Sequence, residues 1–580
     1  MIPESFFLGP DAENVEWAKK KWNKIFEEWI KWRKQNSLGK PIEVSVEKEK
    51  QIKKERDLTE SFLNSLQERF RKEVNTYSPK YMGHMISEIS LPALLGHVLA
   101  LLHNPNNAST EVAKAGHQIE MEAINFLLKM VGFDKEKGRG HFTSGGTVAN
   151  YEAFWRARYR VDHWLSLGLS LMNRGVIEKN TSYFDLAHKG WEYYNQKVLE
   201  YNLTDEEMRE FSLVIQGPWE LNKKLKSVGL RDFTLSPVIL VPSNKHYSWL
   251  KSVSIFGLGD SAFWAVDLDS DGRMCVNDLE RNIERAKKEG RIILMIVSVA
   301  GTTEMGVFDP IDKVQNYLDE LKSDQGIYIW HHIDAAYGGY FCSLIQEEVS
   351  ILSENAMNSL KSISRSDSVT IDPHKLGYIP YACGAILLPD HQNYSVSSFK
   401  APYLEEDESI KGPYWSTTFE GSRSATGASA TWLSSQALSL SPGGHGKVLE
   451  STIEAKREFE KILEKSLSEV LIIKPTDTNI SCFSFVKEGE QLSASNKRVE
   501  AIFKFFANES DFSVSRTVLT MEGYSALINK SLVKRKVQVD VNQMVLIRVV
   551  LMNPFYMEDG YDYLNTSVGR IKSCLENLNI

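Results

Sequence analysis

Residues 368–375 have the sequence Ser368-Val369-Thr370-Ile371-Asp372-Pro373-His374-Lys375. The β-branched run predicts a buried strand, and Pro373 ends it because proline cannot donate a hydrogen bond within a sheet. Lys375 then follows at the exit of the strand, where ligands bind in an α/β sheet. A lysine near apolar walls loses proton affinity and can become a nucleophile, whereas a lone lysine is more often a solvated surface group. The stretch by itself leaves both interpretations open.

Short apolar runs like this one alternate with helical patterns from about residue 111 onward. They lie at residues 238–241, 292–299, 327–333 and 384–388. The alternation predicts βα units and a mostly parallel, buried central sheet. We therefore expect a large α/β domain over residues 111–395. A polar stretch, a helix and further strands follow, so we expect a smaller α+β domain over residues 396–580.

Residues 1–110 are expected to form a helical arm. Trp22, Ile25, Phe26 and Trp29 follow the spacing i, i+3, i+4, i+7 and so share one face of a helix. We expect this face to pack against the body of the protein or against a partner subunit. Binding to a membrane surface is the less favoured alternative, because the polar face mixes glutamate with lysine.

The composition of the 580-residue chain is that of an ordinary soluble globular protein, with 42% hydrophobic and 25% charged residues. A formal net charge of −8 argues against a general nucleic-acid binder. The five cysteines are scattered without CxxC spacing, which argues against disulfides or a zinc site and favours the cytoplasm. We expect no signal peptide, and the longest apolar stretch, near residues 292–300, is too short to span a membrane.

A second motif, residues 328–339 (YIWHHIDAAYGG), places Asp334 at the end of an apolar strand and before small residues. A buried carboxylate requires a cationic partner, and a protonated ring nitrogen would serve. Ala335 and Ala336 would let a flat ring approach the backbone. A carboxylate that caps a turn explains this segment equally well.

A third motif, residues 141–150 (HFTSGGTVAN), has Gly145 and Gly146 before Thr147 and a helical pattern. It predicts a helix N-terminus with a hydroxyl and exposed amides, which suits a phosphate, although an ordinary capped turn is the alternative. The motif is neither a Walker A loop nor GxGxxG. A fourth candidate, His246, follows an apolar run and could stack on a ring or act as an acid or base, whereas a lone histidine is more often structural.

These four motifs, taken together and in this order, resemble the group II pyridoxal-phosphate amino-acid decarboxylases. The resemblance covers nearly the whole chain and rests on the strings TSGGTVAN, KHYSWLK, AGTTEMG, HIDAAYGG and DPHKLGYIPYACGAIL. FLGPDAEN, YMGHMISEISLPALL and HNPNNAS look most similar to bacterial tyrosine decarboxylases. The resemblance implies an α/β enzyme of fold type I, with a mostly parallel central sheet, an N-terminal helical arm and a small C-terminal α+β domain.

Pyridoxal 5'-phosphate is the cofactor that the resemblance implies. Lys375 would attach it covalently, Asp334 would pair with its ring nitrogen, and His246 would stack on one ring face and take part in catalysis. The other implied cofactor contacts are Ala336, Gly146, Thr147, Thr302 and His374.

The implied reaction is decarboxylation of an L-amino acid to its amine and CO2, with L-tyrosine or a related aromatic amino acid as the expected substrate. In this family a loop tyrosine returns a proton to the substrate, and Tyr403 matches it best, with Tyr414 and Tyr394 as alternatives. Arg548 resembles a strand arginine of glutamate decarboxylases and would bind a carboxylate or form a structural ion pair.

The substrate side chain would lie against residues just before the PALL string. His84 and Ser87 could bond a phenolic hydroxyl, while Met85 and Ile86 would pack on a ring. A metal pair of His84 with Glu88 is the less favoured alternative, because structural zinc sites usually need four protein ligands. We expect no metal site.

The resemblance also implies a homodimer in the cytoplasm, with residues 421–423 (GSR) near the phosphate of the neighbouring subunit. We expect an amino-acid substrate and no nucleic-acid or membrane partner. Two alternatives remain at this point. One is another lyase of the same fold, of the glutamate decarboxylase or sphingosine-phosphate lyase type, and the other is a binding protein without catalysis.

Overall fold

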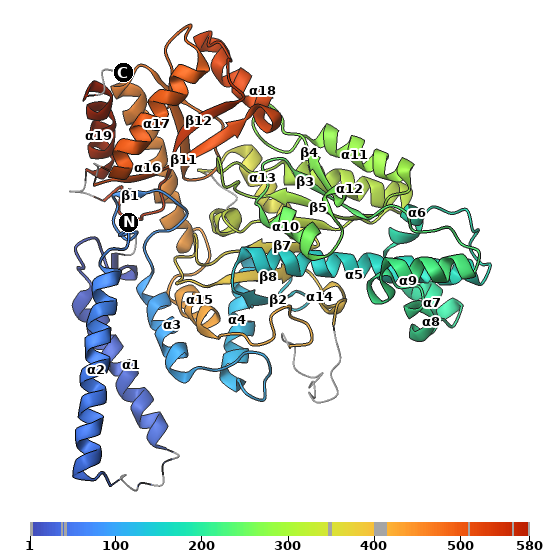
Figure 1. Ribbon diagram of the computed structural model, residues 1–580, viewed down its shortest axis with the longest axis horizontal. Helices are drawn as coiled ribbons and strands as arrows, with labels where there is room; N and C mark the ends of the chain where they lie inside the picture. The colour runs from blue at the N-terminus through green and yellow to red at the C-terminus, as the bar shows by residue number, and fades with distance from the viewer. Residues whose placement is uncertain are drawn as a thin grey trace.

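Seven strands form the central sheet of the protein, in the order β2-β8-β7-β6-β5-β3-β4 (Figure 1). The computed structural model describes residues 4–345 except 36, 38 and 40–42, and residues 351–398, 415–508, 511–558 and 562–577. The strands are β2 (Arg139–Thr143), β3 (Val238–Pro242), β4 (Phe263–Val266), β5 (Ile293–Val299), β6 (His331–Asp334), β7 (Ser368–Ile371) and β8 (Gly384–Leu388). Strands β3 to β7 pair in parallel, and β8 pairs antiparallel with β7 and β2. The expected mostly parallel sheet is confirmed.

Helices cover both faces of this sheet. Helix α5 (Gly146–Asn173) crosses one face and contacts β5, β6, β7 and β8. Side chains alternate along β8, so that Ile386 and Leu388 pack on the α5 side while Ala385 and Leu387 join the core on the other face. The other helices of residues 91–437 are α3 (Leu91–His103), α4 (Lys114–Met130), α6 (Tyr183–Ala187), α7 (Gly190–Glu200), α8 (Asp205–Arg209), α9 (Leu213–Ser227), α10 (Ser248–Ile255), α11 (Val276–Glu289), α12 (Ile311–Gln325), α13 (Glu354–Ser362), α14 (His391–Ser395) and α15 (Thr426–Ala437).

A second sheet lies in the C-terminal part, with the strand order β1-β11-β12-β10-β9. Its strands are β9 (Val470–Ile472), β10 (Ile480–Phe485), β11 (Ser513–Thr520), β12 (Gln543–Val550) and, from the N-terminal part, β1 (Tyr81–Met82). Its helices are α16 (His445–Ser466), α17 (Leu492–Asn508), α18 (Met521–Leu532) and α19 (Tyr563–Asn577). Because β1 pairs in parallel with β11, the chain that leads to residues 84–87 is held by this sheet.

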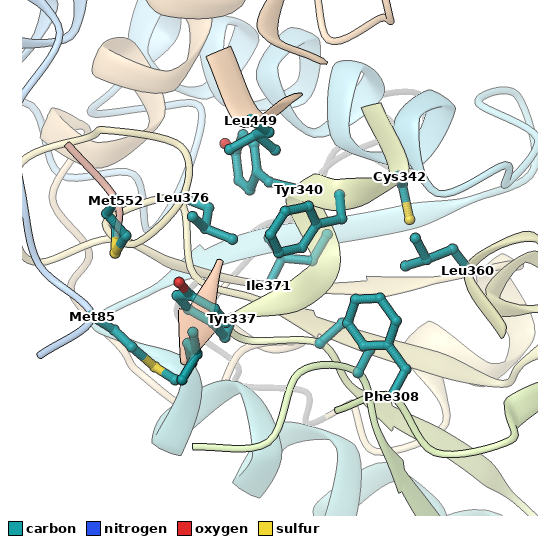
Figure 2. Packing of buried hydrophobic residues seen from close by; sticks show 14 of the residues in the cluster. Met85, Phe308, Tyr337, Tyr340, Cys342, Leu360, Ile371, Leu376, Leu449 and Met552 are labelled. Atoms are coloured by element: carbon teal, nitrogen blue, oxygen red, sulfur yellow. The ribbon is translucent and has the colours of Figure 1, made fainter. Parts of the chain in front are cut away.

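One apolar core joins three stretches that lie far apart in the sequence (Figure 2). Met85 comes from the N-terminal part, Tyr337 and Ile371 from the large domain, and Leu449 and Met552 from the C-terminal part. Full burial of one such side chain stabilises a fold by about 1.5–3 kcal/mol. This shared core therefore fixes the C-terminal part against the large domain.

Two long helices, α1 (Val15–Lys34) and α2 (Val46–Phe70), extend away from the body of the molecule (Figure 1). Neither helix has a buried residue in the single chain. Trp22 and Phe26, on the predicted aromatic face of α1, are 47% and 50% exposed. No helix of the described chain is long and apolar enough to cross a membrane.

Glu88, just before α3, gives the fold a pH dependence. Its side chain is buried, and this burial raises the pKa of the carboxyl group from 4.5 to about 7. Between these two values the folded chain keeps a proton that the unfolded chain has released, so stability falls as the pH rises through this window. We expect Glu88→Gln to raise Tm by roughly 2 °C at pH 8.5 and to leave it unchanged near pH 4.5. Differential scanning calorimetry at both pH values checks this, and an equal effect at both would contradict it.

Candidate active site

A cavity of about 290 Å³ lies where the inner parallel strands end. Residues that follow β3, β5, β6 and β7 line it, together with the first turn of α5. The carboxyl ends of parallel strands share one edge of the sheet, and this edge is the usual ligand site of an α/β fold. The residues singled out in the sequence that line this cavity are Gly146, Thr147, His246, Asp334, Ala336, His374 and Lys375.

The amine of Lys375 lies beside a buried carboxylate that the sequence motifs did not single out. Lys375 Nζ is 3.0 Å from Asp372 Oδ2, and Asp372 Oδ1 is buried without a hydrogen-bond partner among the described residues. A Cβ atom at Gly146 would lie 2.8 Å from Asp372 Oδ2 and 3.2 Å from Cβ of Ala336. Only glycine therefore lets α5 begin this close to the lysine and the small residues after β6.

Asp334 ends β6 and is 5% exposed. Its Oδ2 accepts hydrogen bonds from Asn150 Nδ2 at 2.9 Å and from the Trp249 indole at 3.1 Å, and its Oδ1 accepts from the amide of Ala336 at 3.4 Å. A carboxylate is acceptor-only, so this set of three N–H donors matches its ionised form. The cavity therefore has a fixed negative charge at one wall. Asn150 and Trp249 stand inside quoted motifs, but the sequence analysis gave them no role because neither is near Asp334 in the sequence.

His246 is half-buried at another wall of the cavity. Its Nδ1 lies 2.9 Å from Ser248 Oγ and accepts a hydrogen bond from the Ser248 amide at 3.3 Å. Burial lowers the pKa of the imidazole, against a smaller opposing effect of Asp334. The neutral ring therefore has its proton on Nε2, and its apolar face is suited to stack on a flat ligand.

The first turn of α5 supplies the side of the cavity that suits an anion. Gly146 and Thr147 open the helix, whose N-terminal amides and dipole favour a phosphate. Beside them, His374 Nε2 lies 3.5 Å from Asp372 Oδ2, and burial lowers the pKa of this histidine. Thr302 is buried and its hydroxyl accepts from the Val307 amide, while the adjacent Thr303 lines the cavity.

The residues assigned to a substrate pocket do not line this cavity. Met85 is part of the apolar core, Ser87 is buried, Ile86 is half-buried and His84 is exposed. Arg548 lies near His84. Burial is the largest effect that lowers the pKa of His84, and the positive charge of Arg548 is the second. The side chains of His84 and Arg548 thus lie close together, outside the cavity that Lys375 lines.

Arg548 itself is a buried cation. Its Nη1 donates to Ser515 Oγ at 3.0 Å and to the Gly83 carbonyl at 3.4 Å, while its Nε has no partner among the described residues. Both of these hydrogen bonds go to neutral groups. The charge of Arg548 acts on the buried carboxyl group of Glu304 and lowers the pKa of that group, although burial raises this pKa to about 7 overall.

Of the three candidate loop tyrosines, Tyr403 and Tyr414 lie outside the described residues. Tyr394 is buried, and its hydroxyl lies 3.0 Å from His141 Nδ1. Arg423, considered for a neighbouring subunit, forms a buried ion pair with Glu120 of its own chain. Among the described residues, no cluster of three or more His, Cys, Asp or Glu side chains could hold a metal ion.

Comparisons with known proteins point to one family. The sequence model of the pyridoxal-dependent decarboxylase conserved domain matches residues 215–486. The chain is 30% identical to the L-tyrosine decarboxylase of Enterococcus faecium, over 96% of this chain and 95% of that protein. It is 30% identical to the L-tyrosine decarboxylase of Levilactobacillus brevis, over 80% of this chain and 76% of that protein. The crystal structure of mouse CSAD in apo form has the same fold, with a TM-score of 0.64, 18% identity and coverage of 97% and 98%.

Proposed function

The chain belongs to the pyridoxal-dependent amino-acid decarboxylases, and on this premise we propose that it converts L-tyrosine, or a related aromatic amino acid, to the amine and CO2. Similarity over nearly the whole length of an L-tyrosine decarboxylase is the observation that supports this substrate. Pyridoxal phosphate, when bound, accepts the electrons that decarboxylation leaves on the substrate carbon. The residues that line the cavity bind the cofactor and supply the charged groups around it.

The cavity fits this cofactor in its chemistry. Lys375 offers the amine for covalent attachment, Asp334 a negative charge for the ring nitrogen, and the first turn of α5 a phosphate site. We assign Ala336 to one ring face and His246 to the other. Gly146, Thr147 and His374 are assigned to the phosphate, and Thr302 to the ring oxygen or to the neighbourhood of Asp334.

The amino-acid substrate needs a cation for its carboxylate, and we assign this role to Arg548. We expect Arg548→Gln to lower kcat/KM by about 10- to 100-fold, because a hydrogen bond to a charged group is lost. Arg548→Lys keeps the charge and should recover part of the loss. Arg516, an exposed arginine on the neighbouring strand, provides the control Arg516→Gln. Equal kinetics for Arg548→Gln and this control would contradict the assignment.

An amino-acid panel tests the proposed substrate. Purified protein with added pyridoxal phosphate is offered tyrosine, phenylalanine, tryptophan, glutamate and aspartate, and CO2 and the amine are measured. We expect tyramine from tyrosine at the highest kcat/KM, with His84 and Ser87 bonding the phenol and Met85 and Ile86 packing near the ring. CO2 release from glutamate or aspartate alone would overturn the aromatic assignment.

We also propose a cytoplasmic homodimer, with domains at residues 1–110, 111–395 and 396–580. The exposed aromatic face of α1 supports a partner subunit at the arm. Light scattering coupled to size-exclusion chromatography should give the mass of a dimer. A monomer at micromolar concentration would contradict this part of the proposal.

A further inference from the structure

A row of buried hydrogen bonds leads from the middle of the central sheet to Asp334. Trp330 Nε1 lies 2.8 Å from Ser368 Oγ, and His332 Nδ1 lies 2.8 Å from the same hydroxyl. On the other side of its ring, His332 Nε2 lies 3.3 Å from Asn150 Oδ1, and Asn150 Nδ2 lies 2.9 Å from Asp334 Oδ2. All five side chains are buried. The row therefore connects the carboxylate at the cavity wall to His332, Ser368 and Trp330, which do not line the cavity.

Donor and acceptor chemistry fixes the direction of every bond in this row. The carboxylate of Asp334 can only accept, so the amide nitrogen of Asn150 must face it and the amide oxygen must face His332. Burial lowers the pKa of His332 to about 4, so the neutral ring has one proton, on Nε2, and accepts at Nδ1 from the Ser368 hydroxyl. Thr370 Oγ1 is a second acceptor, 3.4 Å from Nε2. The row starts at an indole, which can only donate, so all the bonds run toward Asp334.

The same amide also reaches the second wall of the cavity. Asn150 Nδ2 lies 3.1 Å from Ser248 Oγ, so this hydroxyl accepts from the amide and donates to His246 Nδ1 at 2.9 Å. The two hydrogens of one amide group thus serve Asp334 and, through Ser248, His246. Asn150 is the point where the two walls of the cavity are coupled.

We propose that Asn150, oriented by His332, is a positioning residue that keeps Asp334 ionised toward the ring nitrogen of pyridoxal phosphate and keeps the proton of His246 on Nε2. This inference rests on the proposed pairing of Asp334 with that nitrogen. Hydrogen bonds to a charged acceptor in a buried site are strong, and their loss leaves an uncompensated charge. On this proposal the protonation of the cofactor ring depends partly on His332, which does not line the cavity.

The variant Asn150→Asp tests the proposal with almost no change of shape. An acidic group at position 150 would stand 2.9 Å from Asp334, and two carboxylates at this distance must share a proton. His332→Phe removes the hydrogen bonds of the ring to Ser368 and Asn150 and keeps an aromatic ring in place. His331→Phe is the matched control, because the neighbouring His331 is equally buried but bonds Ser298 and Gln315 instead.

The readout is the ¹⁵N NMR signal of the ring nitrogen in enzyme loaded with ¹⁵N-labelled pyridoxal phosphate, with kcat and KM measured beside it. We expect Asn150→Asp and His332→Phe to move the signal toward the unprotonated ring and to lower kcat by about tenfold or more, with KM within about threefold. His331→Phe should keep the parent signal. Circular dichroism shows which variants are folded. If only one of the two test variants folds, the signal of that variant alone tests the proposal.

The variant Asp334→Asn tests the pairing of Asp334 with the ring nitrogen separately from the roles of Asn150 and His332. If Asp334→Asn moves the nitrogen signal and the two test variants do not, the role of Asn150 and His332 is overturned while the pairing of Asp334 stands. If Asp334→Asn leaves the signal unchanged, the pairing and the positioning role both fail. A shift of equal size in His331→Phe would assign the effect to general packing and would overturn the proposal.

Discussion

Lys375→Ala is expected to abolish the covalent attachment of pyridoxal phosphate and to lower kcat by at least about a thousandfold, as loss of a nucleophile does in other enzymes. The lysine lies four residues beyond the end of β7, and its Nζ lies 3.0 Å from Asp372 Oδ2 at the cavity. No other lysine lines this cavity within the described chain. Alanine therefore removes the amine that we assign to the covalent attachment.

Mass spectrometry after borohydride reduction measures the attachment directly. The parent protein should gain the mass of the reduced cofactor on the peptide that contains Lys375, and Lys375→Ala should gain none. Lys245→Ala is the control, since Lys245 also follows a central strand but does not line the cavity. Cofactor mass retained in Lys375→Ala would refute the assignment.

Asp334→Asn should lower kcat by about 10²- to 10³-fold, because it removes the negative charge that we assign to the ring nitrogen. The variant also turns one acceptor into a donor beside Asn150 and Trp249, whose N–H groups already point at this carboxylate. Asparagine has the same shape, so loss of charge and of acceptors is the main change.

Steady-state kinetics with saturating cofactor give the value of kcat for this variant. Asp367→Asn is the matched control, because Asp367 precedes a neighbouring strand and pairs with Arg160 away from the cavity. We expect the control to stay within about threefold of the parent. A kcat of Asp334→Asn in that same range would refute the proposed charge pairing.

Local patterns were enough to predict much of the fold and part of the candidate site. The residues that form β7 and β6 are short apolar runs whose ends could be read directly, so Lys375 and Asp334 were found at strand exits. The glycines before Thr147 similarly marked the start of α5. In each case the informative residues are neighbours in the sequence.

Long-range contacts made the rest unpredictable. Asn150 reaches Asp334 across 184 positions, and no local pattern connects an asparagine in a helix to a carboxylate at the end of a strand. Asp372 stood inside a quoted motif, three residues before Lys375, yet its closeness to Gly146 depends on the fold. Met85 lies in a core whose other members come largely from the large domain and the C-terminal part.

The pairing of β1 with β11 has a consequence for how the chain folds. Residues 81–82 are made early and residues 513–514 late, so the small sheet cannot be completed until almost the whole chain has left the ribosome. Until then β1 has no partner strand, and in a fragment that lacks β1 one side of β11 is an unpaired edge, which is a template for intermolecular association. A C-terminal fragment expressed alone should aggregate more readily than the same fragment supplied with a peptide that contains β1.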